Sequence, residues 1–110
     1  MIARLWSAQT TPELSDSYLR HFEQAVRPEL QRVTGFLGAT VCTRRLPVIV
    51  EIIVTTYWES FAAIDAFAGA DRESAVVGAE AAALLTDFDK RVRHYEVTLA
   101  EFPGFPPDRR

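Results

Sequence analysis

The stretch from Pro47 to Tyr57 constrains the fold most, because the strand that it predicts is apolar on both faces. Side chains alternate between the two faces of a β-strand. One face would carry Val48, Val50, Ile52, Val54 and Thr56, and the other Ile49, Glu51, Ile53, Thr55 and Tyr57. A chain of 110 residues has too few helices to cover both sides of its own sheet. We therefore expect helices on one face and a second copy of the protein on the other, in a homodimer joined through its sheets.

The length of the chain predicts one domain, over residues 1–101, followed by an irregular tail at residues 102–110. The net charge of −3 gives no basic surface for nucleic acid. The longest apolar run is too short to span a membrane, and no signal segment precedes the first strand. These features predict a soluble cytoplasmic protein. The single cysteine, Cys42, lies in a predicted strand, which favours a buried and inert thiol.

The hydrophobic periodicity predicts strands over residues 2–8, 36–43, 47–57 and 92–100. A helix is expected to begin at Thr11 and Pro12, to kink or split at Pro28, and to end before Gly35.

A second helix is expected from Ser60 to Gly69, and Asp71 is expected to cap a further helix that carries Ala75 to Leu85. The second and third strands are joined closely enough to form an antiparallel hairpin. The order strand, helix, strand, strand, helix, strand is that of a ferredoxin-like α+β fold with a four-stranded antiparallel sheet.

Four stretches carry a resemblance to a known family: Thr34 to Gly38, Thr56 to Ser60, Ile64 to Gly69 with Ala75 to Val77, and Val92 to Val97. With them the chain resembles the antibiotic biosynthesis monooxygenase-like group of the dimeric α+β barrel superfamily, from Met1 to about Glu101. The resemblance implies a cavity between each subunit's helices and its sheet. It implies either oxidation of polycyclic aromatic compounds by molecular oxygen, without a bound metal or flavin, or binding and degradation of haem.

Three departures disfavour the haem reading. The haem branch typically has an asparagine on the first strand, where this chain has Arg4, Trp6 and Ser7. That branch also has a histidine in the helical region after the Trp-x-Ser motif, whereas residues 74–85 contain none. Its tryptophan late in the second helix aligns with Phe67. The resemblance therefore favours an oxygenase that uses no cofactor.

His94 is the candidate catalytic base, because an imidazole accepts protons near neutral pH. Glu96 or Glu51 would orient its ring. In the alternative, His94 is a hydrogen-bonded residue that anchors the dimer interface. Glu51 itself, a carboxylate in an apolar strand, needs a partner, and Arg4, Arg93 or His94 are candidates for that partner.

Arg4 and Trp6 share one face of the first strand, so they line a pocket if that face looks towards the helices. Arg4 would hold an anionic oxygen, and Trp6 and Trp58 would form aromatic walls. Trp58 is alternatively a core residue. Tyr18 and His21 lie three residues apart on the first helix, near the edge of its buried stripe, where both would border the mouth of a cavity. The simpler interpretation makes His21 a surface residue. Phe67 completes the expected substrate-binding set of Arg4, Trp6, Trp58, Tyr18 and Phe67.

The sequence therefore predicts a cofactor-independent monooxygenase-like protein for a small aromatic or polyketide-like substrate, with no metal site. One alternative is a non-catalytic ligand-binding or structural dimer, with the pocket filled by Phe22, Phe61 and Phe67. A weaker alternative is a haem-binding or haem-degrading protein.

Overall fold

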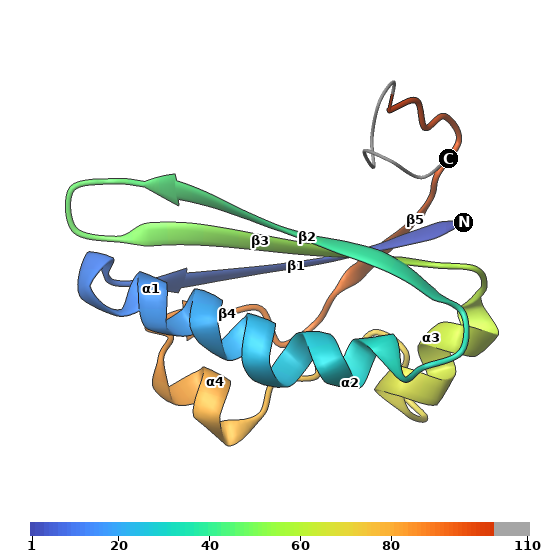
Figure 1. The fold of residues 1–110 in the computed structure, drawn as a ribbon, viewed down its shortest axis with the longest axis horizontal. Helices are drawn as coiled ribbons and strands as arrows, with labels where there is room; N and C mark the ends of the chain where they lie inside the picture. Colours follow the sequence, from blue (N-terminus) through green and yellow to red (C-terminus); the bar gives the residue numbers. More distant parts are fainter. Residues whose placement is uncertain (103–110) are drawn as a thin grey trace.

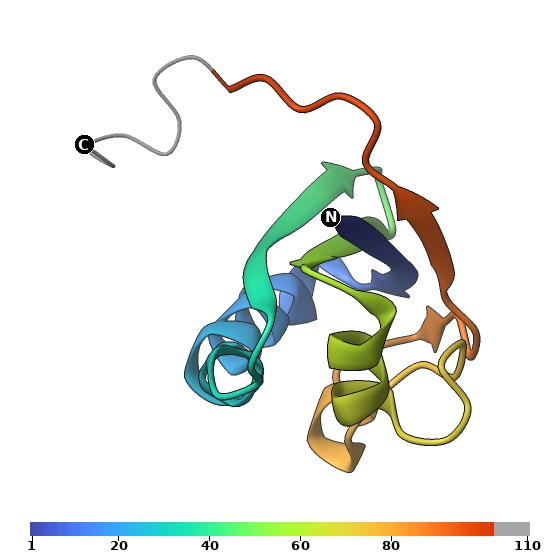
Figure 2. The ribbon, with the colours of Figure 1, turned by 90° about the vertical axis from the view of Figure 1, so that its right-hand side faces the viewer.

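The computed structural model describes residues 1–102, in which the helices cover one face of an antiparallel sheet and leave the other face open (Figure 1, Figure 2). The sheet consists of β1 (Ile2–Thr10), β2 (Phe36–Arg45), β3 (Val50–Trp58), β4 (Asp87–Phe88) and β5 (Arg93–Glu96). Its order is β2-β3-β1, and both β4 and β5 then pair with the free edge of β1. The predicted ferredoxin-like α+β arrangement is confirmed.

The last strand differs from the prediction over residues 92–100. Two short strands share the fourth position in the sheet, and the second of them, β5, ends at Glu96. Asp87 lies in β4 opposite Gln9 of β1. Most of the predicted tail, residues 103–110, lies outside the described residues.

Strand β3 shows the alternation that the sequence indicated. Val50, Ile52, Val54, Thr56 and Trp58 are buried. Between them, Glu51, Ile53, Thr55 and Tyr57 face the side without helices and retain solvent exposure. The helices therefore cover one face of β3 only, and the other face has no cover within this subunit.

The first helical region consists of α1 (Pro12–His21), a π-helical turn η1 (Phe22–Val26) and α2 (Arg27–Gln31). Thr11 caps α1, because its Oγ1 accepts a hydrogen bond from the N–H of Leu14 at 3.2 Å. Pro28 has no N–H to donate, and the helix widens into η1 immediately before it, where the N–H of Arg27 bonds to the carbonyl of Phe22. The expected irregularity at Pro28 is thus a π-helical turn.

Helix α3 (Phe61–Ala68) begins and ends where the sequence predicted. Ser60 Oγ accepts from the N–H of Ala63 at 3.2 Å, and Gly69 ends the helix with a φ of 87°. A positive φ of this kind is easily adopted only by glycine.

The helix predicted from Asp71 is wrong, because only α4 (Ala79–Ala83) forms in that region. Before it, the backbone groups of residues 72–75 bond elsewhere. The carbonyls of Arg72 and Ser74 accept from the side chain of Arg4, and the N–H of Ala75 donates to Lys90. Tertiary partners therefore replace helical hydrogen bonds in this segment.

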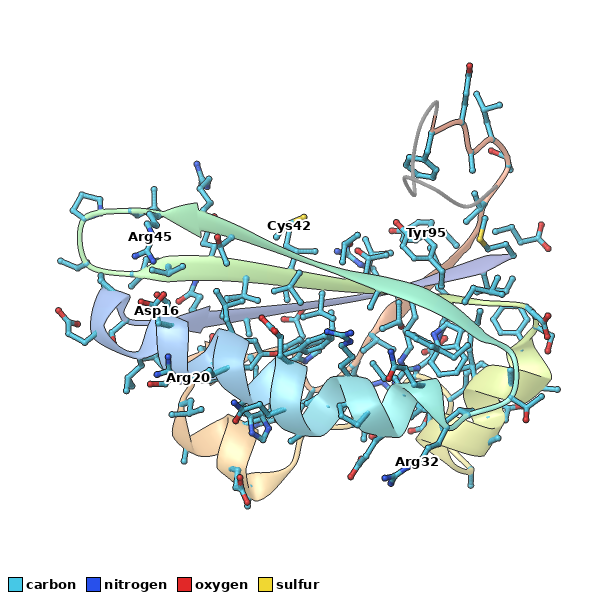
Figure 3. All side chains as sticks on the ribbon, viewed as in Figure 1. Asp16, Arg20, Arg32, Cys42, Arg45 and Tyr95 are labelled. Atoms are coloured by element: carbon cyan, nitrogen blue, oxygen red, sulfur yellow. The ribbon has the colours of Figure 1, made fainter. Side chains whose placement is uncertain are left out.

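The open face of the sheet carries Cys42 and Tyr95, whose side chains point away from the helices (Figure 3). Cys42 is exposed in this subunit, so the expectation of a buried thiol is wrong for the isolated chain. The prediction was based on the general tendency of free cysteines to be buried, whereas Cys42 lies on the face of β2 that no helix covers. Within residues 1–102, no helix has the length and apolar character needed to cross a membrane.

Candidate functional site

A cavity of about 90 Å³ lies between the sheet and the helical layer. Strand β1 contributes Arg4 and Trp6, and the first helical region contributes residues from Tyr18 to Leu30. Its outer wall includes Val76, Val77 and Gly78 from the irregular segment before α4. The lining is mainly aliphatic and aromatic, with few polar groups. Such a cavity suits an apolar ligand that carries one or two polar groups.

Arg4 is the only charged group deep in this site among the described residues, and it is only 4% exposed. Its Nη1 donates to the carbonyl of Arg72 at 2.6 Å, and its Nη2 donates to the carbonyl of Ser74 at 2.8 Å. No carboxylate within residues 1–102 forms an ion pair with Arg4. Burial lowers the pKa of this guanidinium, but arginine remains protonated in proteins. Among the described residues, only neutral groups therefore solvate the positive charge in this cavity.

His94 lies beside Arg4, because these residues are paired in the register of β5 and β1. Its Nε2 is 3.0 Å from Nη1 of Arg4. A guanidinium only donates, so Nε2 is the acceptor and the ring proton is assigned to Nδ1. Burial, and next the charge of Arg4, lower the pKa of His94. His94 is a neutral acceptor here, and it is not among the residues that line the cavity.

The carboxylates expected near His94 have other positions. Glu51 accepts from Nε of Arg44 on the neighbouring strand at 2.7 Å and is partly exposed, so the predicted partners Arg4, Arg93 and His94 are wrong. Glu96 is exposed on the edge strand β5. The ring of His94 instead packs edge-on against Phe61, with ring centroids 5.7 Å apart.

Trp6, Tyr18 and Phe67, all expected at the pocket, do line the cavity. The Trp6 Nε1 donates to the carbonyl of Asp89 at 2.8 Å, which fixes the indole ring. The centroids of Trp6 and Tyr18 are 6.4 Å apart, and Phe67 lies 5.7 Å from Cζ of Arg4. Burial raises the pKa of Tyr18 to about 12, so its hydroxyl group stays protonated near neutral pH.

Trp58 has a different place from the predicted aromatic wall. Its side chain is 0% exposed and does not line the cavity. Its Nε1 donates to Oγ1 of Thr56 at 2.8 Å, and its ring packs against Phe36 and Phe67. The structure thus matches the alternative interpretation, in which Trp58 is a core residue that supports the cavity from behind.

Two parts of the lining differ from the favoured interpretation of the sequence. His21, for which a surface position was the simpler interpretation, lines the cavity, and its Nδ1 is 3.8 Å from the carboxylate of Glu80. Its i+3 spacing from Tyr18 was the available signal. Residues 76–78 form part of the outer wall, although the sequence predicted helix there. No group of three or more potential metal ligands occurs within residues 1–102.

An antiparallel sheet covered on one face by helices, with an aromatic cavity between the layers, defines an α+β protein of the ferredoxin-like class. The sequence profile of the antibiotic biosynthesis monooxygenase family matches residues 1–79, and the chain belongs to that family. No curated protein matches the sequence.

Solved structures show the same fold. One is a monooxygenase from the gene ActVA-Orf6 of Streptomyces coelicolor in complex with nanaomycin D. It is 20% identical with a TM-score of 0.67, over 93% of this chain and 91% of that one. Another is the haem degrader MhuD from Mycobacterium tuberculosis, with two haems in its active site. It is 22% identical with a TM-score of 0.59, over 93% of this chain and 100% of that one. At these identities, the likeness shows the fold alone.

Proposed function

We propose that this protein is a cofactor-independent monooxygenase that acts on a small aromatic substrate. The observation that carries the proposal is the buried charge of Arg4, which has no carboxylate partner within residues 1–102, inside an aromatic-lined cavity. Membership of the antibiotic biosynthesis monooxygenase family supports the reaction class. An electron-rich aromatic anion reacts with oxygen without a metal or flavin if the protein orients and desolvates it.

In the proposed reaction, a phenol loses the proton of its hydroxyl group, and the ring carbon of the resulting anion bonds to one atom of molecular oxygen. Loss of the ring hydrogen and cleavage of the O–O bond then give a quinone and water. The substrate supplies all the electrons, so the balance needs no other reductant. Arg4 contributes a positive charge that holds an anionic group of the substrate, and Trp6 and Phe67 orient its ring.

The proton acceptor is one of two histidines. His94 was predicted from the sequence, but in this conformation its Nε2 already accepts from Arg4. His21 lines the cavity, where a neutral imidazole accepts a proton from a bound ligand. We therefore propose His21 as the base and His94 as a residue that positions Arg4.

The volume of the cavity limits the substrate. Sites for drug-sized ligands usually enclose about 300–1,000 Å³, whereas this one holds about 90 Å³. A single aromatic ring is the ligand that suits it. A polyketide-like or haem-sized ligand would require displacement of the wall at residues 76–78. The same small volume favours, as a second candidate function, a dimer that binds a ligand without oxidising it.

The proposal includes assembly into a homodimer through the open face of the sheet. Ile53 is 45% exposed there and Tyr95 is 51% exposed. Covering apolar side chains of this size with a second sheet is favourable by roughly 25 cal/mol per Å².

Oxygen consumption with a panel of monocyclic phenols and quinols tests the proposed reaction. We expect uptake of one oxygen molecule per quinone formed, without added metal, flavin or nicotinamide. In a parallel absorbance titration of the protein with hemin, we expect no shift of the Soret band. If no phenol or quinol supports oxygen uptake although ligands bind the cavity, the protein is a binding protein and the oxygenase proposal fails.

A further inference from the structure

We propose that the group which Arg4 binds is the carboxylate of a single-ring aromatic ligand, held by two parallel hydrogen bonds. This inference rests on the cavity of the proposed function and names its ligand class. It distinguishes the anionic group that anchors the ligand from the oxygen that reacts. Arg4 binds the ligand through a carboxylate, and the reacting ring oxygen lies elsewhere in the cavity.

The donors of Arg4 give the first argument. A guanidinium has five N–H groups in a fixed plane. Nη1 bonds to the carbonyl of Arg72 and to Nε2 of His94, and Nη2 bonds to the carbonyl of Ser74. These three bonds leave the N–H of Nε and one N–H of Nη2. When the two carbonyls occupy the end of the guanidinium, the remaining donors lie side by side along one edge.

The accessibility of Nε gives the second argument. Within residues 1–102, every fully buried nitrogen or oxygen of a side chain has a hydrogen-bond partner. Nε of Arg4 has no partner there, so it is not fully buried, although the residue as a whole is only 4% exposed. The open space that Arg4 lines is the cavity. Because Arg4 lines the cavity, the two donors without a partner in residues 1–102 are the ones available to a ligand there.

The shape and charge of that pair select the ligand. Two parallel N–H donors match the two oxygens of a carboxylate, whereas a phenolate offers one oxygen. The charge of Arg4 has no carboxylate partner within residues 1–102, so an anion completes the site. Phe67 lies 5.7 Å from Cζ of Arg4, which places an aromatic wall next to the anchor for the ring of an aromatic acid.

The test compares benzoate with benzamide, its neutral planar counterpart, by isothermal titration calorimetry on the full chain near neutral pH. We expect benzoate to bind about tenfold tighter or more, which is typical of hydrogen bonds to a charged group. Equal affinity, or no binding of either compound at millimolar concentration, would overturn the proposal. This comparison uses the unchanged protein and therefore does not depend on the folding of a variant.

Two substitutions refine the test. Arg4→Met should abolish the preference for benzoate, whereas the control Arg44→Met, at an exposed arginine paired with Glu51, should keep it. Arg4→Lys keeps a charge but loses the paired donors, so we expect it to recover only part of the preference. Full benzoate affinity in Arg4→Lys would contradict binding by two parallel bonds.

The outcomes separate this inference from the oxygenase proposal, because benzoate has no ring hydroxyl group to oxidise. Preference for benzoate without oxygen uptake from any phenol would support the carboxylate site and contradict the reaction. Oxygen uptake from phenols without a preference for benzoate would support the reaction and contradict the carboxylate site.

Discussion

Gly35, between the first helical region and β2, is the residue whose replacement the structure tolerates least in that turn. Its φ is 95°, and an added Cβ would lie 2.6 Å from Cβ of Ala63 in α3. Its carbonyl also accepts from the N–H of Glu59 at 2.8 Å. A side chain here is strained by the backbone and by contact with α3.

We therefore expect Gly35→Ala to lower the free energy of unfolding by about 2 kcal/mol, measured by urea denaturation. Gly38→Ala is the matched control, because a Cβ added there would meet nothing within 4 Å and its φ is not positive. We expect that control to change the free energy of unfolding by roughly 0.5 kcal/mol or less. Equal effects of both substitutions would contradict this account.

His94 makes the stability depend on pH. Burial and the charge of Arg4 lower its pKa in the folded protein below the ordinary value of 6.5. The unfolded chain consequently binds more protons between these two values, and stability rises with pH there. We expect the contribution of His94 to the free energy of unfolding to be at its maximum above about pH 6.5. That contribution should be lost as the pH drops through the lowered pKa. Urea titrations of the native protein and His94→Gln should show a flatter pH dependence for the variant. The carboxyls of Asp65 and Asp71 have lowered pKa values and respond only in more acidic solution.

The two histidines should differ in kinetics if the oxygenase proposal is correct. We expect His21→Gln to lower kcat by about a hundredfold or more, as loss of a general base does. His94→Gln should mainly raise KM, because it removes an acceptor from Arg4 and leaves the proton acceptor in place. A large loss of kcat in His94→Gln alone would restore His94 as the base.

Individual contacts explain why only part of the site followed from the sequence. Strand alternation placed Arg4 and Trp6 on one face, and helical spacing placed Tyr18 at the cavity. The partners of Arg4 lie 68 to 90 residues away in the chain, so no local pattern indicated them. The partner of Glu51, Arg44, is close in the chain, but the pairing depends on the exact register of the hairpin, which the sequence did not indicate.

At the scale of elements, the π-helical turn explains a spacing that a regular helix does not accommodate. Tyr18, Phe22, Val26 and Leu30 all line the cavity at intervals of four residues. On an α-helix, each such interval rotates the side chain by about 40°, so three intervals would turn Leu30 away from Tyr18. The wider turn of η1 corrects this drift. The sequence indicated an irregularity through Pro28 but not its form.

The caps of α1 and α3 were predictable because they depend on residues close in sequence, whereas the cap expected at Asp71 does not form. Ser60 caps α3, and we expect Ser60→Ala to cost about 1 kcal/mol of stability. Ser17→Ala, within α1 and without a cap role, is the control and should have little effect. Thermal and urea unfolding of the two variants would measure the difference. Similar losses would show that the Ser60 hydroxyl group contributes no special stability.

The segment from Asp71 to Gly78 shows where local propensity failed. Its composition favoured a helix, yet Asp71 pairs with Arg91 and the nearby carbonyls bond to Arg4. Contacts to β1 and to the chain before β5 therefore outweigh a weak helical preference. The split of the last strand into β4 and β5 has the same origin, since the residues between them bond to this segment.

At the scale of the whole molecule, one face of the sheet has no cover within residues 1–102 (Figure 2). The apolar residues on both faces of a single strand indicated that one face of the sheet would lack helices. The order of the predicted elements indicated the fold class. The partner that covers this face stays a prediction.

We expect the protein to be a dimer at micromolar concentration by light scattering, and Ile53→Glu to shift it towards a monomer. Val48→Glu is the control, because Val48 is 76% exposed in the hairpin connection, away from the centre of the sheet. A compact monomer in the unchanged protein would contradict the proposed assembly.

The sole thiol of the chain, Cys42, gives experimental access to this surface. Its side chain points outward from β2 (Figure 3), and Cys42 is paired with Ile53 in the register of the hairpin. A maleimide dye attached to Cys42 would therefore occupy the surface at which the second subunit of the proposed dimer would bind. The rate of labelling should therefore slow as the protein is concentrated, and a bulky dye, once attached, should keep the chains apart.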